Sequence, residues 1–183
     1  YDYQVIGRNE AGGSKILVAY ARRTDMAALL DALEQSGLDP KQITVGPLAM
    51  SKLHSHLSQL STASTVAIVD IGHQFTELTI LHEGQPQVVR HISGGGAVIT
   101  KKLADVFQVH VKDAERGKLS EGHLASIQGG LEPGSREAII DESCRAGLSP
   151  IAREIKRSLA AFRSTSGQQV TEVILTGGTT LLR

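Results

Sequence analysis

The chain has 183 residues but only one cysteine, Cys144, no tryptophan and few aromatic residues of any kind. A single thiol excludes an internal disulfide and any metal site built from several thiolates, and it fits a reducing compartment. An excess of charge of one sign is lacking as well, because 19 basic and 19 acidic residues cancel and no run of Lys or Arg builds up. This balance argues against binding to nucleic acid or to an anionic membrane surface.

Long apolar runs are also missing. No stretch approaches the roughly 18 to 20 residues that a membrane span requires, and the first residues lack the pattern of a signal peptide. The chain starts at Tyr1 within a strand-like pattern and stops at Arg183 directly after a Gly-Gly-Thr-Thr turn. We therefore expect it to be a piece of a longer protein. Its 40% hydrophobic content is enough for a substantial core.

The first chemical signal lies in residues 65–81. Residues 66–69 are an unbroken apolar run, which predicts a buried strand ending at Asp70. Gly72 permits a tight reversal, and alternation from Thr76 onward predicts a second strand. At the tip of such a hairpin the carboxylate suits a hydrated Mg²⁺, while backbone N–H groups and the Thr hydroxyl suit a phosphate. The alternative is that the Asp and Gly only make the turn.

Two later strands also run into glycines. Residues 87–92 are followed by Gly94, Gly95 and a third glycine, and then by a predicted helix whose first N–H groups should be free to bind a phosphate. Residues 170–175 form an apolar run that ends in Gly177-Gly178-Thr179. A glycine run before a helix is also common at a flexible helix entry, so the residues alone leave both interpretations open.

A helix is predicted over residues 111–119, where Glu115 and Lys118 are three apart and therefore share one face. At this spacing a carboxylate and an ammonium usually form no more than a surface ion pair. The seven histidines are dispersed without the spacing of a transition-metal site. Only His73, within the hairpin tip, is placed to touch a ligand.

The rest of the chain supplies predicted secondary structure. Gly147 and Pro150 interrupt a helical pattern over residues 136–162, which predicts two helices or one kinked helix. The N-terminal third has the pattern of a small α/β unit. Its expected features, in order, are a strand hairpin at residues 3–6 and 15–20, a helix with Thr24 as its N-cap, a strand at 43–45, a helix at 47–60 and a domain boundary at 61–64.

In this order the motifs resemble the second half of the actin-like ATPase superfamily. Residues 69–76, Val-Asp-Ile-Gly-His-Gln-Phe-Thr, resemble its second phosphate motif, and residues 174–180, Ile-Leu-Thr-Gly-Gly-Thr-Thr, resemble its adenosine motif. Residues 114–118 resemble the segment whose Glu and Lys reach the ribose side of the nucleotide. Residues 2–7 and 17–23 are most similar to the branch that contains the cell-division protein FtsA, the pilus assembly protein PilM and the cytoplasmic part of the secretion protein GspL.

The resemblance implies an α/β protein with the actin-like (ribonuclease H-like) fold, in which a mixed sheet is flanked by helices, plus part of a smaller α/β lobe. Residues 1–62 would be the remainder of the first lobe, and residues 63–183 the second actin-like lobe. The resemblance also implies that Asp70 coordinates Mg²⁺. The residues that it places at the nucleotide are Asp70, Gly72, Thr76, Gly94, Gly95, Glu115, Lys118, Gly177, Gly178 and Thr179.

Two departures bear on activity. In this superfamily the nucleotide site is shared by two lobes, and the first lobe's own phosphate turn would lie upstream of this chain. Because phosphoryl transfer needs charge neutralisation from several sides, we expect ATP and Mg²⁺ only in the full-length protein, and no catalytic activity in this part. In the second phosphate turn, His73, Gln74 and Phe75 replace smaller residues or acids, which favours a degenerate site.

The expected function is that of a cytoplasmic assembly-platform component of a type II secretion system or a type IV pilus, peripheral to or tethered at the bacterial inner membrane. Any ATP would be a structural ligand or a slow switch. The expected partners are an inner-membrane assembly protein and the secretion ATPase of that machine, with self-association as a further expectation and no nucleic acid. The alternatives are an active actin-like ATPase and a filament-forming protein related to FtsA.

Overall fold

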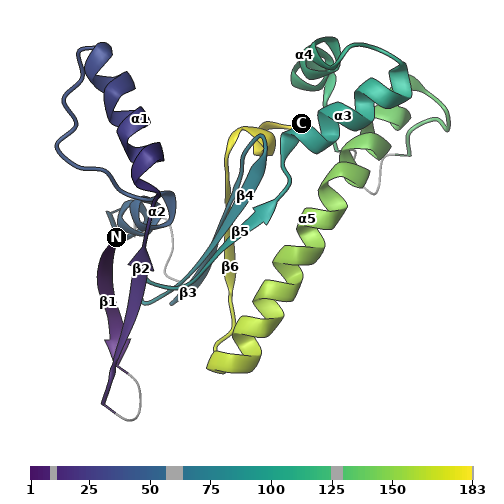
Figure 1. The fold of residues 1–183 in the computed structure, drawn as a ribbon. Helices are drawn as coiled ribbons and strands as arrows, with labels where there is room; N and C mark the ends of the chain where they lie inside the picture. The colour runs from purple at the N-terminus through teal and green to yellow at the C-terminus, as the bar shows by residue number, and fades with distance from the viewer. Residues whose placement is uncertain (9–11, 57–63, 125–129, 183) are drawn as a thin grey trace.

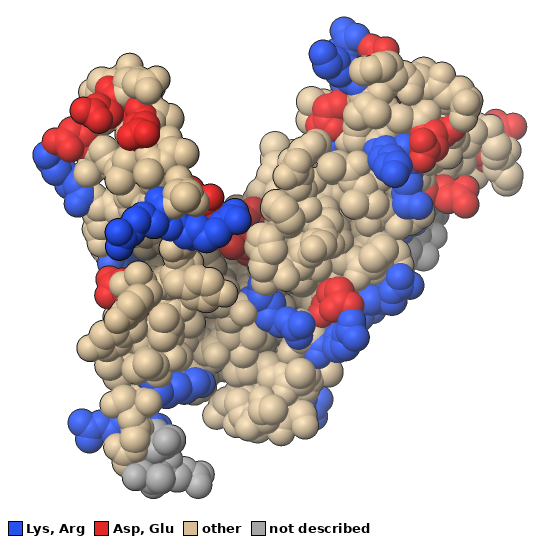
Figure 2. Space-filling model, viewed as in Figure 1, with Lys and Arg blue, Asp and Glu red and all other residues tan. Residues whose placement is uncertain are grey.

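The structure, a computed structural model, describes residues 1–8, 12–56, 64–124 and 130–182. It has the mixed α/β architecture that the resemblance implies (Figure 1). A four-stranded sheet stands at the centre with a long helix beside it, and a two-stranded hairpin with its own helix forms a separate arm. In the space-filling view a notch separates the arm from the rest, and acidic and basic side chains are interspersed over the visible face (Figure 2).

The central sheet is mixed and consists of β3 (Thr65–Ile71), β4 (Phe75–His82), β5 (Gln85–Ser93) and β6 (Glu172–Thr176). The first three strands form an antiparallel meander and β6 pairs parallel to β3, which gives the order β5-β4-β3-β6. The hairpin predicted at residues 65–81 is therefore confirmed. Strand pairing places Asp70 opposite Glu77 on one side and Thr176 on the other.

This half of the molecule is completed by α3 (Gly96–Phe107), α4 (Val111–Glu121), α5 (Arg136–Ser166) and the 3-10 helix η2 (Gly178–Leu181). The start of α5 is fixed by Ser135, whose Oγ accepts a hydrogen bond of 3.1 Å from the N–H of Ala138. Its end is at Gly167, where a φ of 69° suits a glycine. Pro150 lies inside this helix of 31 residues, so the interrupted pattern belongs to one helix.

Both faces of the sheet are covered. Val69 belongs to the cluster that packs under Phe162 of α5. Val66 and Ile68 belong to the opposite cluster, where they meet Met50 of α2 (Gly46–His56). This two-sided burial confirms the interpretation of residues 66–69 as a strand buried on both faces. A third cluster joins α3, α4 and α5 through Ile99, Leu103, Ala104, Ala114, Ile140 and Cys144.

The N-terminal arm consists of β1 (Asp2–Arg8), β2 (Ser14–Ala19) and α1 (Arg23–Gln35). The two strands pair antiparallel, as predicted. The N-cap of α1 is Arg22, so the prediction of Thr24 is wrong; Thr24 lies in the first turn, with its hydroxyl 3.4 Å from Asp25 Oδ1. The strand predicted at residues 43–45 is also wrong, because this short run has no neighbouring strand to pair with among the described residues.

The predicted boundary at residues 61–64 lies mostly outside the described residues, as do residues 57–60 of the predicted second helix. The division into residues 1–62 and 63–183 therefore stays a prediction. The described part of that helix, α2, packs against the central sheet, where the hydroxyl of Ser51 donates to the carbonyl of Gly84 at 3.0 Å. Within the described ranges no helix combines the length and the apolar character needed to cross a membrane.

Candidate functional site

The tip of the β3–β4 hairpin meets the start of α3 and the loop between β6 and η2 (Figure 1). The carbonyl of Gly72 accepts hydrogen bonds from the N–H of Gly96 at 3.0 Å and from the hydroxyl of Thr179 at 2.8 Å. The N–H of Ala97 donates to the carbonyl of His73 at 2.8 Å. The three glycine-containing motifs, which are far apart in the sequence, are therefore assembled at one end of the sheet.

The first N–H groups of α3 are bound within the protein. Gly96 and Ala97 donate to the hairpin tip, and the N–H of Gly94 donates to the carbonyl of Gln74 at 3.0 Å. The expectation that the start of this helix leaves its donors free is therefore wrong, because the carbonyls of the turn supply the acceptors. Thr76 is buried, and its hydroxyl donates to the carbonyl of Gly94 at 2.9 Å.

Two of the glycines allow the motifs to approach closely. A Cβ on Gly95 would lie 2.3 Å from the carbonyl oxygen of Gly72, which no real structure tolerates without a shift. A Cβ on Gly177 would lie 2.3 Å from Asp70 Oδ1, and the φ of Gly177 is +92°, a conformation that favours glycine. These residues are needed for backbone packing around Asp70 and Gly72, whether or not a phosphate binds.

The side chains of Glu115 and Lys118 form an ion pair at the other side of this junction. Lys118 Nζ lies 2.8 Å from Glu115 Oε2, 3.0 Å from Thr100 Oγ1 and 3.2 Å from the carbonyl of Gly96. An ammonium has three protons to donate, so this buried lysine is fully satisfied within the protein. The pair is thus more than the surface ion pair that its spacing suggests.

Burial and hydrogen bonding act in opposite directions on Glu115. Burial alone would raise the pKa of its carboxyl group. The hydrogen bonds from Lys118 and Thr100 and the charges of Lys118 and His73 together outweigh burial and hold this pKa below its ordinary value of 4.5. Glu115 is therefore ionised at neutral pH, and the buried ammonium keeps its counter-ion.

A cavity of about 300 Å³, which we call the α4–η2 cavity, opens beside this pair. Of the residues predicted to bind a nucleotide, it brings together Glu115, Lys118, Gly178 and Thr179. Thr100 was missed by the sequence analysis; its only signal is a position one helical turn after Gly96, whose carbonyl oxygen lies 3.0 Å from Thr100 Oγ1. Among the described residues, the lining consists of His73, Glu115, Lys118, Leu119, Ser120, Gly122, Gly178, Thr179, Leu181 and Leu182.

Asp70 lies on the other side of the hairpin tip, in a shallower hollow that we call the tip pocket. This pocket is lined by Asp70, Gly72, His73, Gln74, Phe75, Glu77 and His91. Glu77 was not predicted, although the hairpin register places it directly opposite Asp70. Among the described residues no group of three or more His, Cys, Asp or Glu side chains is arranged to hold a metal ion. Asp70 as a Mg²⁺ ligand would need further oxygens from water or phosphate, and its role stays a prediction.

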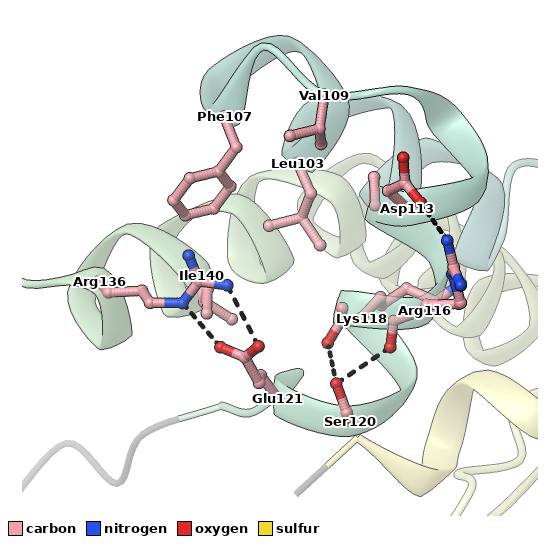
Figure 3. Close-up of a pocket in the computed structure, with 12 residues that line it drawn as sticks. Leu103, Phe107, Val109, Asp113, Arg116, Lys118, Ser120, Glu121, Arg136 and Ile140 are labelled. Atoms are coloured by element: carbon pink, nitrogen blue, oxygen red, sulfur yellow. Dashed lines mark hydrogen bonds and ion pairs between the residues drawn. The ribbon is translucent and has the colours of Figure 1, made fainter.

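A larger and more apolar cavity of about 480 Å³ lies between α3, α4 and the start of α5 (Figure 3). Leu103, Phe107 and Ile140 form its walls, and the ion pair of Arg136 with Glu121 lies at its edge. The guanidinium carbon of Arg136 also lies 5.0 Å from the centre of the Phe107 ring. This cavity shares only Lys118 with the predicted nucleotide residues, so it is distinct from the junction of the three motifs.

Comparison with known proteins shows which proteins this chain resembles. The model of the family described as type IV pilus assembly protein PilM matches residues 1–183. The cell division protein FtsA of Bacillus subtilis (strain 168) is 31% identical over 101 residues, which are 55% of this chain and 22% of the relative.

Two solved structures are also similar to this chain. A chain of a PilM–PilN type IV pilus biogenesis complex superposes with a TM-score of 0.78 and 26% identity, over 100% of this chain and 50% of that chain. MreB5 of Spiroplasma citri bound to ADP superposes with a TM-score of 0.63 and 18% identity, over 90% of this chain and 56% of that chain, and shows the fold alone. The actin-like fold is confirmed, and the chain spans about half the length of these structures.

Proposed function

Because the chain belongs to the family of the type IV pilus assembly protein PilM, whose model matches all of residues 1–183, we propose that it is part of an assembly-platform component that recruits partner proteins at the bacterial inner membrane. The family and the likeness to a PilM–PilN complex support a role in pilus assembly. We place the protein on the cytoplasmic side of that machine. The platform of a type II secretion system is the alternative setting for the same function.

We further propose that the nucleotide site is structural or vestigial. The observation that carries this view is that the strongest donors of the site are already paired inside the protein. All three protons of Lys118 have acceptors, and the first N–H groups of α3 are bound by the hairpin tip. An enzyme that transfers a phosphoryl group needs such donors directed at the phosphates.

Recruitment is tested by co-purification. The full-length protein is expressed together with the PilN-type protein of the same organism, with the tag on one partner and then on the other. We expect a complex of defined stoichiometry that survives both arrangements. An unrelated tagged protein of similar size is the control, and failure to recover the partner in either arrangement would count against the recruitment proposal.

The nucleotide site is tested by titrating the full-length protein with Mg-ATP. We expect weak binding, with a Kd between about 10 μM and 1 mM. The affinity of Asp70→Ala for Mg-ATP should be at least about tenfold lower, because the phosphate turn loses its carboxylate. Asp25→Ala, which removes an exposed carboxylate of α1, is the matched control and should bind as the wild type does. Unchanged binding in Asp70→Ala would remove Asp70 from the site.

The alternative, an active ATPase, makes a different prediction for the same proteins. It requires Mg²⁺-dependent phosphate release by the full-length wild type, and this release must disappear in Asp70→Ala. If the wild type shows no Kd for Mg-ATP below about 1 mM, the ATPase is excluded, and the recruitment proposal is unaffected.

A further inference from the structure

The cavity of about 480 Å³ between α3, α4 and the start of α5, which we call the three-helix cavity, lies outside the junction of the glycine motifs. Leu103, Phe107 and Ile140 point toward its centre from two of these helices (Figure 3). Protein interiors leave few voids larger than a water molecule, and ligand pockets usually have volumes of about 300 to 1,000 Å³. An apolar space of this size is therefore suited to a ligand.

The apolar wall of the three-helix cavity reaches the surface of the molecule. Val109, which lines the cavity between α3 and α4, is 44% exposed, and Val111 at the start of α4 is 55% exposed. A closed cavity would suit a small molecule. An apolar wall that opens to solvent suits side chains that project from another protein, because such anchors enter from a larger contact surface.

The guanidinium of Arg136 is held in place at the edge of this wall. Its Nε and Nη2 donate to the two carboxylate oxygens of Glu121 at 2.7 and 3.1 Å, and its carbon lies 5.0 Å from the centre of the Phe107 ring. The hydrogen bonds from Arg136 hold the pKa of the Glu121 carboxyl group below its ordinary value of 4.5, so both groups are charged at neutral pH. A side chain fixed in this way loses little entropy when it binds a further group.

Arg136 also has donors to spare. A guanidinium has five N–H donors, and Glu121 is their only acceptor among the described residues. The other two cations of the lining, Arg116 and Lys118, already pair with carboxylates of α4. The unused edge of Arg136 is therefore the polar group that a partner meets beside the apolar wall, and its geometry suits a carboxylate.

We propose that the three-helix cavity is a docking site for a segment of a partner protein in which a carboxylate lies within about one helical turn of two bulky apolar side chains. The apolar side chains enter between Leu103, Phe107 and Ile140, and the carboxylate accepts hydrogen bonds from the unused edge of Arg136. The proposal rests on the proposed recruitment function and names the chemistry of a partner. Its failure would leave recruitment in place, because co-purification with the PilN-type protein tests recruitment through any surface.

The test is a selection of random displayed peptides of about 12 residues on the full-length protein. Gly117→Leu serves as the counter-selection. Gly117 lines the cavity, and a Cβ there would meet no atom within 4 Å, so a leucine enters open space without displacing the protein's own atoms. Peptides that are enriched on the wild type but not on Gly117→Leu should carry a carboxylate beside apolar side chains.

Fluorescence polarisation of one enriched synthetic peptide then measures the role of Arg136. Arg136→Gln should bind it at least about tenfold more weakly than the wild type. Replacing the peptide's carboxylate by an amide should weaken binding to the wild type by a similar factor and have no further effect on Arg136→Gln. Arg145→Gln is the matched control, because Arg145 also pairs with a carboxylate at 2.7 Å on α5 but lies outside the lining; it should bind as the wild type does.

Two further measurements separate lost binding from lost folding. Gly117→Leu should unfold at no lower temperature than the wild type, since it replaces a glycine within a helix. Arg136→Gln breaks an ion pair, so Val109→Asp provides a second test at a side chain that is 44% exposed. It places a carboxylate beside that of the peptide and should also reduce the affinity at least about tenfold.

Several results would overturn the proposal. If no peptide is enriched on the wild type over Gly117→Leu, the cavity does not take a protein segment. If the enriched peptides lack carboxylates, or Arg136→Gln binds them as the wild type does, Arg136 is not the recognising group. Binding of decanoate with a Kd below about 1 mM and of no peptide would identify a small anionic amphiphile as the occupant. A dimer of the wild type that is lost in Gly117→Leu would identify a second copy of the chain.

Discussion

The N-terminal arm and the half that contains the central sheet use similar sequence patterns but bury them to different extents. Leu78, Ile80 and Ile99 of the sheet half have no exposed surface. In the arm, α1 has no buried side chain, and the facing pair Tyr3 and Val18 are 62% and 47% exposed. An amphipathic pattern predicts which side of an element is apolar, but it does not say what covers that side.

The difference in burial between the two regions should produce a difference in their stability. Burial of apolar surface is the main stabilising contribution to a fold, so the sheet half should unfold last and the arm should open first. Hydrogen exchange measured along the chain should show the greatest protection in β3 and β4 and the least in α1. Equal protection in the two regions would show that the arm is stabilised by interactions that its exposure does not reveal.

The largest expected effect comes from the core. Leu78→Ala should lower the free energy of unfolding by about 2 to 5 kcal/mol, because it leaves a cavity beneath α5. Leu30→Ala, in a leucine of α1 that is 41% exposed, should cost less than about 1 kcal/mol. Urea denaturation monitored by circular dichroism measures both. Similar losses in the two variants would contradict the difference between the regions.

The second-largest effect on stability concerns two glycines of the sheet half, in which substitution by alanine should have opposite results. Gly95→Ala should destabilise the protein by about 2 to 3 kcal/mol, since its methyl group would overlap the carbonyl oxygen of Gly72. Gly117 lies within α4, and a Cβ at this position would meet no atom within 4 Å. Gly117→Ala should therefore stabilise the protein by about 0.5 to 1 kcal/mol. Thermal unfolding of both variants is the measurement. A loss of stability in Gly117→Ala would mean that its helix tolerates no added side chain there.

A third effect concerns the buried ion pair. Glu115→Gln leaves Lys118 without its counter-ion and should cost about 1 to 3 kcal/mol at neutral pH. Because the pKa of Glu115 is lowered in the folded protein, its stabilising contribution is complete above pH 4.5 and is lost as the pH falls below 4.5 through the lowered value. Urea denaturation from pH 7 to pH 3 should therefore show wild type and variant converging in acid.

The control for this ion pair is Asp113→Asn, which removes an exposed carboxylate of the same helix that pairs with Arg116. It should reproduce neither the loss at pH 7 nor the convergence in acid. If Glu115→Gln is as stable as the wild type at neutral pH, the ammonium of Lys118 must be satisfied by Thr100 and the carbonyl of Gly96 alone.

The smallest effect belongs to the arm. Asp25→Asn breaks an ion pair with Arg22 in which both side chains are more than half exposed, and should change the free energy of unfolding by less than about 0.5 kcal/mol. The measurement is urea denaturation at low and high salt. A loss above about 1 kcal/mol would show that α1 is held by more than its visible contacts.

Local patterns made much of the fold predictable. The β3–β4 hairpin and the helices α3 and α4 follow from periodicity and turn residues, because the hydrogen bonds that define them join residues close in the sequence. The same reasoning failed at residues 43–45, where a run of three β-branched residues without a partner strand forms no ladder. The actin-like fold came from the order of the motifs rather than from any single one.

The site was less predictable, because its decisive contacts join distant residues. Lys118 reaches Thr100 and the carbonyl of Gly96, which lie 18 and 22 residues earlier in the chain. The carbonyls of the turn take up the first donors of α3, and neither motif contains a signal for this pairing. The nucleotide roles of the ten predicted residues therefore stay predictions, although the structure brings their motifs together.

The proline within α5 has a mechanical consequence. Before Pro150, Ile140 and Cys144 pack with α3 and α4, and after it Phe162 packs with the sheet. A proline has no N–H to donate to the carbonyl one turn earlier, so the helix bends there more easily than elsewhere. The N-terminal end of α5 thus supports α3 and α4, and its C-terminal end supports the sheet that carries the β3–β4 tip beside the α4–η2 cavity. A bend at Pro150 would therefore move α4 relative to the hairpin tip and change the width of this cavity.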